Sequence, residues 1–208
     1  MKIEIWSDYA CPFCYIGKRK LELAIQQASI KEPIEIEFKS FELNPDSPKE
    51  YKENIHEIIA SKYGIPVEEA RATNDRIISM AKEVGLNYNF DDLKPTNTFD
   101  AHRLSHYAKA EGKNKEYSEA VLKSYFVESN LISNHEVLAD LAESIGLDKQ
   151  KALAILSSDQ YAKEVREDEK KAHELRVDSV PYFLFNGTKA ISGALPVESF
   201  LEVFQKIS

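Results

Sequence analysis

The sequence predicts an α/β fold in which a mixed sheet carries an inserted all-helical domain. Its first part has the pattern of a strand, a helix and a strand, and its last part that of two strands and a helix. The segment between them shows helical periodicity only. Joining the two outer parts would give one mixed sheet. We therefore predict a sheet domain from residues 1–44 and 158–208, with residues 45–157 as the inserted helical domain.

The N-terminal part contains two alternating apolar runs on either side of a helical pattern. Residues Ile3–Trp6 alternate apolar and charged side chains, which predicts a strand. Apolar residues then recur at helical spacing and predict a helix over Pro12–Ser29. A second strand is expected over Ile34–Phe38, where the alternation is again regular. The turn residues of Asn44–Pro48 mark the boundary to the next part.

The middle of the chain predicts five amphipathic helices. Four of the seven glycines stand just beyond the ends of these helices, where a left-handed residue is favoured. The predicted helices are Ile55–Tyr63, Pro66–Val84, Phe99–Ala110, Tyr117–Tyr125 and a last one that Asn134 caps and that runs to Ile145.

The C-terminal part returns to strands after one more helix. A polar helix is expected from about Asp159 to Arg176. Strands are expected over Val180–Phe185 and Lys189–Ser192, because the Asn186–Thr188 segment between them contains Asn-Gly, a strong hairpin signal. A closing amphipathic helix begins at Pro196.

The only two cysteines form the motif Cys11-Pro12-Phe13-Cys14 directly after the first strand. A helix beginning near Pro12 places Cys11 at its N-terminus, where free N–H groups and the helix dipole stabilise a thiolate. We expect Cys11 to be the exposed, attacking thiolate and Cys14 the more buried, resolving thiol. Phe13 supplies no cationic partner, so we expect a less extreme reduction potential than a histidine there would give. The direction of the reaction stays open.

The alternative for this motif is half of a zinc site. Such a site would need two further ligands, and the chain has no second cysteine pair. His102 and His106 lie four apart on one predicted helix, but no Glu follows His102, so the zinc-protease pattern fails. We expect packing and polar capping for these two and no metal. The five histidines are His56, His102, His106, His135 and His173.

The charge and hydropathy of the sequence limit which classes of binding partner we expect. Acidic residues outnumber basic ones by 35 to 27, which gives a formal net charge of −8 and argues against nucleic acid or an anionic membrane. No stretch approaches the roughly 20 apolar residues of a membrane span. The N-terminus carries Glu4 where a signal peptide would have its apolar core, so we expect a cytoplasmic protein. In that reducing compartment a cysteine pair is more often catalytic than structural.

Three sets of charged residues could be given a functional role, but we expect solvent exposure for each of them instead. Lys18-Arg19-Lys20 is expected to be a solvated helix face, and so is the run Arg166–Lys171. Glu37 could be a buried proton shuttle for Cys14. However, it shares a strand face with two other charged residues, which predicts that it is exposed.

Several segments together resemble a known family. They are Asp8–Gly17, Phe41–Pro45, Asn97–Leu104, Val180–Phe183 and Ile191–Ala194. With them the chain resembles the thioredoxin-like fold of the DsbA type and, more narrowly, the FrnE-like cytoplasmic branch. This resemblance implies a thioredoxin-like fold with an inserted all-helical domain (DsbA-like).

The resemblance also implies site residues. It implies that Val180-Pro181 is a cis peptide facing the cysteines, with the Val180 backbone as an open hydrogen-bonding edge for an extended substrate. It further implies that the segment around Asn97 and His102 lines the cleft. The predicted catalytic residues are Cys11 and Cys14, and the predicted substrate-binding residues are Pro12, Phe13, Asn97, His102, Val180 and Pro181.

Three functions remain open at this point. The first is a thiol-disulfide oxidoreductase (protein dithiol-disulfide type) acting on protein or small-molecule disulfides, with the redox-active pair in place of a cofactor and glutathione as a candidate co-substrate. The second is a glutathione-dependent isomerase or transferase. The fold resembles 2-hydroxychromene-2-carboxylate isomerases and kappa-class glutathione transferases, which typically carry Ser at the position of Cys11. The third is a binding module or chaperone without redox turnover.

Overall fold

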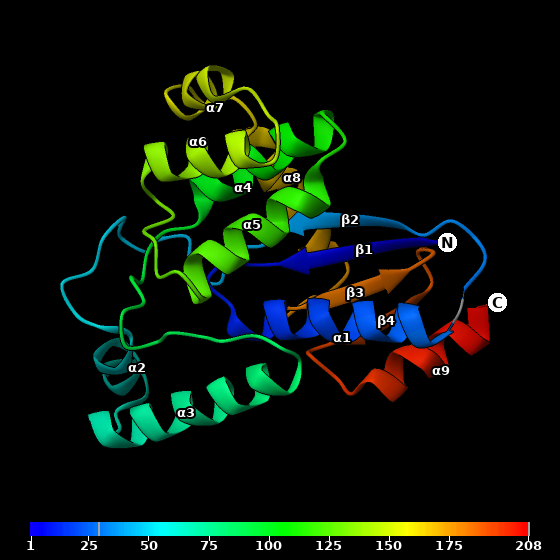
Figure 1. The fold of residues 1–208 in the computed structure, drawn as a ribbon, viewed down its shortest axis with the longest axis horizontal. Helices are drawn as coiled ribbons and strands as arrows, with labels where there is room; N and C mark the ends of the chain where they lie inside the picture. The colour runs from blue at the N-terminus through cyan, green and yellow to red at the C-terminus, as the bar shows by residue number, and fades with distance from the viewer. Residues whose placement is uncertain (29, 208) are drawn as a thin grey trace.

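The fold is built on a four-stranded mixed sheet with helices on both faces (Figure 1). The computed structural model describes residues 1–28 and 30–207. The strand order is β2-β1-β3-β4; β1 and β2 are parallel and the other two pairs antiparallel. The pairing of β1 with β3 joins the two ends of the chain, as predicted. The strands are β1 (Lys2–Ser7), β2 (Glu35–Ser40), β3 (Tyr182–Phe185) and β4 (Lys189–Ser192).

The helices agree with the predicted ones except for one that the sequence analysis did not distinguish. That helix, α7, is short and begins after Asp148, whose carboxylate accepts a hydrogen bond from the Lys151 amide. The predicted end of the first helix at Ser29 and the predicted end of the sheet domain at Ser208 lie outside the described residues. The helices are α1 (Pro12–Ala28), α2 (Ile55–Tyr63), α3 (Val67–Glu83), α4 (Phe99–Ala110), α5 (Asn114–Phe126), α6 (His135–Ser144), α7 (Lys149–Leu156), α8 (Ala162–Glu174) and α9 (Val197–Ile207).

One face of the sheet is covered by α1 and α9. Alternate residues of the strands point toward these helices, among them Ile3 and Ile5 of β1 and Phe183 of β3. On α9, Phe200 packs edge-on against Phe183, with ring centroids 5.0 Å apart, and Phe204 extends the same buried cluster. The apolar residues of the strand alternation and those of the helical periodicity therefore pack against each other in one layer.

The opposite face is covered by α8 together with α4 and α5, and it carries buried charge. Glu37 of β2 is only 8% exposed, and its carboxylate pairs with Lys2, Lys39 and Lys109. The expectation that Glu37 is exposed is therefore wrong. The alternation of β2 is regular, but the inserted helices cover its second face and supply Lys109 as a partner.

The charged run of α8 is also partly buried. Asp168 is 7% exposed, and its carboxylate accepts hydrogen bonds from the Ser40 amide and pairs with Lys39 and His106. Arg166, by contrast, is exposed as expected. The prediction of a wholly solvent-facing run is wrong at Asp168 because α8 lies against β2.

Side chains of the helices also bind the outer backbone of β2 and of the residues after it. The Phe38 amide donates to Asn114 of α5 at 2.7 Å, and the Ser40 amide to Asp168 at 3.0 Å. Two residues further on, the Glu42 amide donates to a carboxylate oxygen of α8 at 3.3 Å. Alternate amides along this line are thus satisfied by side chains.

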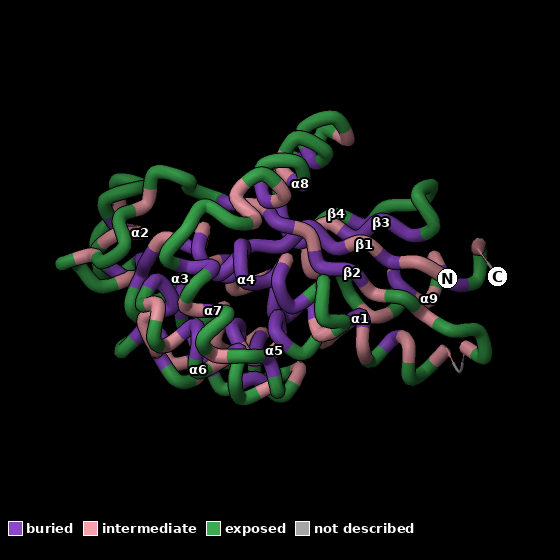
Figure 2. The backbone as a smooth tube through the Cα atoms, turned by 90° about the horizontal axis from the view of Figure 1, so that it is seen from above, coloured by how far each residue is buried: buried purple, intermediate pink, exposed green. Residues whose placement is uncertain are grey.

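The helices between β2 and β3 share a core of their own, which Figure 2 shows as a buried interior among α3 to α7. Tyr15 and Ile16 of α1 belong to the same cluster, so the apolar contact runs from the helical part to the sheet part. The division into residues 1–44 with 158–208 and residues 45–157 stays a prediction.

Lys18 and Arg19 join the two parts rather than facing solvent. Lys18 is 3% exposed and pairs with Glu22 at 2.7 Å and with Glu119 of α5. Arg19 pairs with the same Glu119, whose carboxylate also accepts a hydrogen bond from Tyr15 at 2.6 Å. The expected solvated face is therefore wrong for these residues, because α5 packs against α1 and brings a carboxylate to both.

None of the helices in residues 1–28 and 30–207 is long and apolar enough to cross a membrane.

Candidate active site

The two cysteines lie at the start of α1, shortly after the end of β1, as the sequence predicted. The Cys11 amide donates to the Asp8 carbonyl and the Cys14 amide to the Cys11 carbonyl, each at 3.1 Å. Both side chains are free thiols. Because β3 runs antiparallel to β1, with Trp6 opposite Tyr182, the loop before β3 reaches the same end of the sheet. The topology thus brings the cysteines and Val180-Pro181 together.

Cys11 is buried, which corrects the expectation that it is exposed. It is 4% exposed and Cys14 is 2% exposed. Both belong to an apolar cluster with Trp6, Val177 and Val180. The loop that leads into β3 therefore lies over the tip of α1, and a substrate must displace or pass this cover to reach the sulfur.

The backbone of Val180 contacts the thiol of Cys11. The Cys11 thiol donates to the Val180 carbonyl at 3.5 Å. The bond between Val180 and Pro181 is cis, as predicted from the resemblance. Gly17 makes this close approach of α1 possible, because a Cβ on it would stand 2.9 Å from Pro181 Cγ.

The thiol of Cys14 is held in its protonated form by its surroundings. Burial raises the pKa of Cys14 well above its ordinary value, and the neighbouring Cys11 raises it further. Ser7 and the backbone of Asp8 act in the opposite direction by hydrogen bonding to the sulfur. The thiol of Cys14 therefore resists ionisation.

Asp8 is a functional candidate that the sequence analysis did not single out. It is 2% exposed, and its carboxylate accepts hydrogen bonds from the Leu43 amide at 2.8 Å and from the Thr98 hydroxyl at 2.8 Å. His102 Nε2 lies 3.3 Å from the same carboxylate. Asp8 thereby fixes the turn before Cys11 to the loop after β2 and to the start of α4. Its place three residues before the motif was the available signal.

His102 and Asn97 lie in this supporting layer. His102 is 2% exposed and its ring packs on that of Tyr9, with centroids 4.8 Å apart. Asn97 accepts a hydrogen bond from the Phe99 amide and donates to the Pro45 carbonyl. Both side chains are therefore engaged within the protein, and their predicted substrate contacts stay predictions.

Glu42 is a second buried carboxylate near the site. One of its oxygens pairs with Arg166 at 2.5 Å, and the other has no hydrogen-bond partner among the residues that the structure describes. Burial raises the pKa of Glu42, and His102 and Arg166 only partly counter it. Glu42 follows Phe41, which packs against the cysteine cluster.

Tyr88 also contacts the motif, and sequence reasoning missed it. Its hydroxyl donates to the Pro12 carbonyl at 2.7 Å. Burial raises the pKa of Tyr88, and the thiols of Cys11 and Cys14 raise it further. The alternation of Leu86, Tyr88 and Phe90 indicates an extended segment with one buried side, which was the signal that could have found it.

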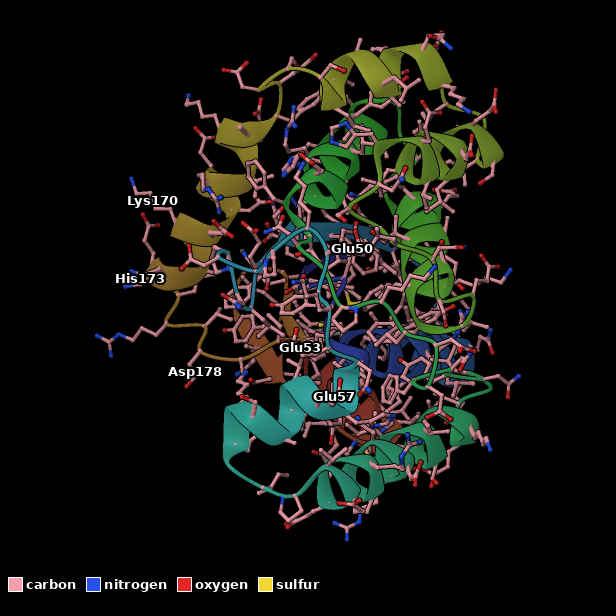
Figure 3. All side chains as sticks on the ribbon, turned by 90° about the vertical axis from the view of Figure 1, so that its left-hand side faces the viewer. Glu50, Glu53, Glu57, Lys170, His173 and Asp178 are labelled. Carbon is pink, nitrogen blue, oxygen red and sulfur yellow. The ribbon has the colours of Figure 1, made fainter. Side chains whose placement is uncertain are left out.

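The surface around this end of the sheet carries charge of both signs. Figure 3 looks at the end of the molecule toward which β1 runs. Glu50, Glu53 and Glu57 stand on the loop after β2 and on α2. On the other side, α8 carries Lys170 and His173. Within residues 1–28 and 30–207 no group of three or more His, Cys, Asp or Glu side chains is arranged to hold a metal ion.

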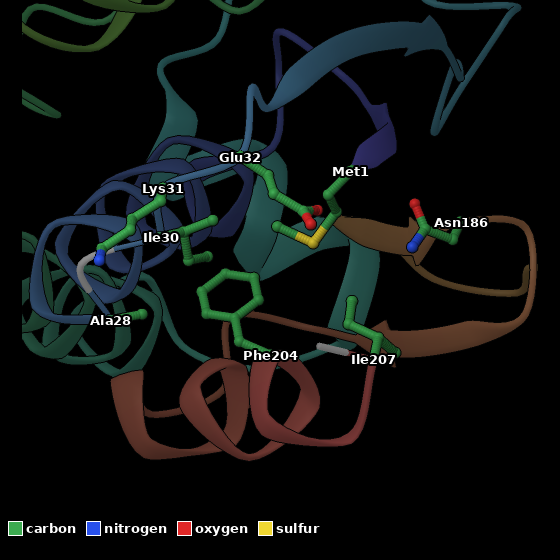
Figure 4. Close-up of a pocket in the computed structure, with 8 residues that line it drawn as sticks. All are labelled: Met1, Ala28, Ile30, Lys31, Glu32, Asn186, Phe204 and Ile207. Atoms are coloured by element: carbon green, nitrogen blue, oxygen red, sulfur yellow. The ribbon is translucent and has the colours of Figure 1, made fainter.

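Two hollows differ in their relation to the cysteines. One of about 350 Å³ lies at the opposite end of β1, around Met1, Ile30 and Phe204 (Figure 4). The other, of about 550 Å³, is lined by Val177 and by residues at the end of α8. Since Val177 packs against the cysteine cluster, this second hollow borders the site and the first does not.

Comparison with known proteins places the chain in a family. The model of the DSBA-like thioredoxin domain matches residues 2–205. The uncharacterised protein YwbO of Bacillus subtilis is 31% identical over 206 residues, covering 98% of this chain and 94% of YwbO. A probable DsbA oxidoreductase from Streptomyces coelicolor superposes with a TM-score of 0.94 at 35% identity, covering 99% of this chain and 89% of that one.

Two more distant solved structures share the fold. A 2-hydroxychromene-2-carboxylate isomerase has a TM-score of 0.75 at 16% identity, covering 100% of this chain and 96% of that one. The cytosolic disulfide reductase DsbM of Pseudomonas aeruginosa has a TM-score of 0.69 at 14% identity, with 100% of both chains covered, and it has also been solved with GSH. The resemblance drawn from the sequence is thus confirmed at the level of family and fold.

Proposed function

Because the chain belongs to the DSBA-like thioredoxin domain family, we propose that it is a thiol-disulfide oxidoreductase whose redox pair is Cys11 and Cys14. The observation that carries this proposal is the pair of free thiols at the tip of α1, with the Cys11 thiol hydrogen-bonded to the Val180 carbonyl. A thiol at a helix N-terminus is easily activated, and a second thiol one turn away can complete the exchange.

The reaction consists of two exchanges. The Cys11 thiolate attacks one sulfur of a disulfide, a mixed disulfide forms, and the other sulfur leaves as a thiolate that takes up a proton. Cys14 then loses its proton and attacks Cys11, so the substrate's second thiol leaves and the protein disulfide remains. The substrate is reduced by two electrons and the cysteine pair is oxidised by two. Two thiols such as glutathione can reverse these steps.

The environment of Cys14 suits the second step. Burial and the adjacent Cys11 raise the pKa of Cys14, which keeps it protonated before substrate arrives. Once Cys11 is bound in a mixed disulfide it carries no charge, and its contribution to this rise is lost. Ser7 and the Asp8 backbone then favour the Cys14 thiolate. The pKa of Cys14 is therefore lower in the mixed disulfide than in the free dithiol, which favours the second step.

Substrate binding is proposed for the groups around the sulfur. The Val180 carbonyl, now paired with the Cys11 thiol, would accept an N–H of an extended substrate once Cys11 reacts. Pro12, Phe13 and Pro181 would supply the apolar surface beside it. Asn97 and His102 are proposed to contact the substrate, as the resemblance implies, and His102 also contacts Asp8 before the motif. Glutathione as co-substrate and a cytoplasmic setting are part of the same proposal, in line with the cytosolic reductase DsbM and its complex with GSH.

Exchange with oxidised glutathione and with insulin tests the proposal. We expect Cys11→Ser to abolish both activities, because the one remaining thiol, Cys14, is buried and its raised pKa keeps it protonated. Cys14→Ser should keep the first step only and accumulate a mixed disulfide on Cys11, visible by intact mass. Activity of Cys11→Ser equal to that of the wild type would contradict the proposal.

The second candidate, a glutathione-dependent isomerase or transferase, is supported by the fold likeness to the chromene-carboxylate isomerase alone. The retained pair of thiols is not needed for that reaction, so we place it second. Chromene-carboxylate turnover by a Cys14→Ala variant would reverse this order.

A further inference from the structure

The hydroxyl of Tyr88 reaches into the redox motif from a distant part of the chain. It donates to the carbonyl of Pro12, between the two cysteines, at 2.7 Å. Among the residues that the structure describes, no other side chain donates a hydrogen bond to the backbone of residues 11–14. Tyr88 comes from the segment between α3 and α4, which runs beside α1 (Figure 1).

The ring of Tyr88 is held independently of its hydroxyl. It stacks on Phe126 of α5 with centroids 4.8 Å apart and on Tyr15 of α1 at 6.2 Å, and Phe90 lies at 5.5 Å. Packing alone accounts for an aromatic ring here, and a phenylalanine would satisfy it. It does not account for a hydroxyl that is directed at the carbonyl of a motif residue. The hydroxyl therefore calls for a separate explanation.

We propose that Tyr88 is a positioning residue of the redox pair, which holds the Cys11–Cys14 loop in its dithiol form through the Pro12 carbonyl. This inference rests on the proposed function. The hydrogen bond is present while both cysteines are free thiols. A disulfide requires the two sulfurs to come within about 2.05 Å of each other, which constrains the backbone between them. In this proposal the hydrogen bond fits the backbone of the dithiol form better than that of the disulfide form. Tyr88 thus shifts the redox equilibrium without touching either sulfur.

A redox equilibrium separates this role from a structural one. The balanced reaction is the protein disulfide with two glutathione thiols, against the protein dithiol with one glutathione disulfide. A hydroxyl that only supports the fold stabilises both forms equally, and its loss leaves the equilibrium constant unchanged. A hydroxyl that favours the dithiol form changes it.

The test compares Tyr88→Phe with the wild type in glutathione buffers of graded ratio, with the two forms counted by thiol trapping. We expect the equilibrium to move about threefold to tenfold toward the disulfide, as for the loss of one hydrogen bond. The matched control is Tyr117→Phe, which removes a buried hydroxyl that has no partner among the described residues. It should leave the equilibrium constant within about twofold of the wild type.

The melting temperature of each variant is measured alongside. An unchanged equilibrium constant for Tyr88→Phe would overturn the inference, whatever happens to the melting temperature. An equal shift in Tyr117→Phe would overturn it as well, because the effect would then not depend on the Pro12 contact. A wild-type protein that forms no Cys11–Cys14 disulfide at any ratio would instead overturn the proposed function itself.

Discussion

Replacing Glu37 by Gln tests the buried charge cluster between the sheet and the inserted helices. Burial alone would raise the pKa of Glu37, but hydrogen bonds from Lys109, Lys2 and Lys39 outweigh it and lower the pKa from 4.5 to about 2. A lowering from 4.5 to about 2 corresponds to roughly 3 kcal/mol of folding free energy. Lys2 and Lys109 are partly exposed, so we take about 2 to 3 kcal/mol after allowing for solvent screening.

The sign of the pH dependence follows from the lowered pKa of Glu37. A carboxyl group with a lower pKa in the folded state stabilises the fold above its unfolded pKa, and that contribution is lost as the pH falls from about 4.5 to about 2. We therefore expect Glu37→Gln to lower the free energy of unfolding by about 2 to 3 kcal/mol at pH 7. At pH 2.5 the difference between the variant and the wild type should have fallen to about 1 kcal/mol or less.

Urea unfolding of both proteins between pH 7 and pH 2.5 measures this difference. The control is Glu35→Gln on the same strand, whose side chain is exposed and whose loss should change the free energy by less than about 0.5 kcal/mol. A gap between Glu37→Gln and the wild type that stays constant over this pH range would refute the reasoning. So would an equal loss in the control.

Two further changes address the cysteine site. Gly17→Ala should lower the free energy of unfolding by about 1 kcal/mol and slow disulfide exchange, because contact with Pro181 outweighs the gain in helix propensity; a more stable variant in urea unfolding would contradict this. Burial and the nearby Cys11 raise the pKa of Cys14, so the dithiol form should lose stability as the pH rises above the ordinary thiol value of 9.0. Comparing urea unfolding of the wild type and Cys14→Ala at pH 8 and pH 10 measures this loss, and identical pH dependence would count against it.

Much of the fold could be predicted because its patterns are local. The alternation in β1 and β2, the glycines beyond helix ends and the hairpin signal each depend on a few neighbouring residues. The hairpin lies where Asn186 and Gly187 adopt the left-handed conformation, as their sequence indicates. The cysteine pair could be located in the same way, since strand and helix patterns flank it.

The errors arose where distant segments decide the outcome. Cys11 is covered by the Val180 loop, which lies at the other end of the chain, so the motif alone could not predict its burial. Glu37 lies on a regular alternating strand, and only the docking of α4 brings Lys109 to it. Tyr88 is the same kind of case, because its contact with Pro12 depends on how the inserted helices pack.

The side chains that bind the outer amides of Phe38, Ser40 and Glu42 also have a consequence for biosynthesis. An open strand edge is a template for pairing with another chain, and here side chains of α5 and α8 close it without adding a strand. Their contributing residues, Asn114 and Asp168, are translated long after β2. The nascent chain therefore leaves the ribosome with this edge bare. It stays open to aggregation until α5 and α8 have been made and have docked.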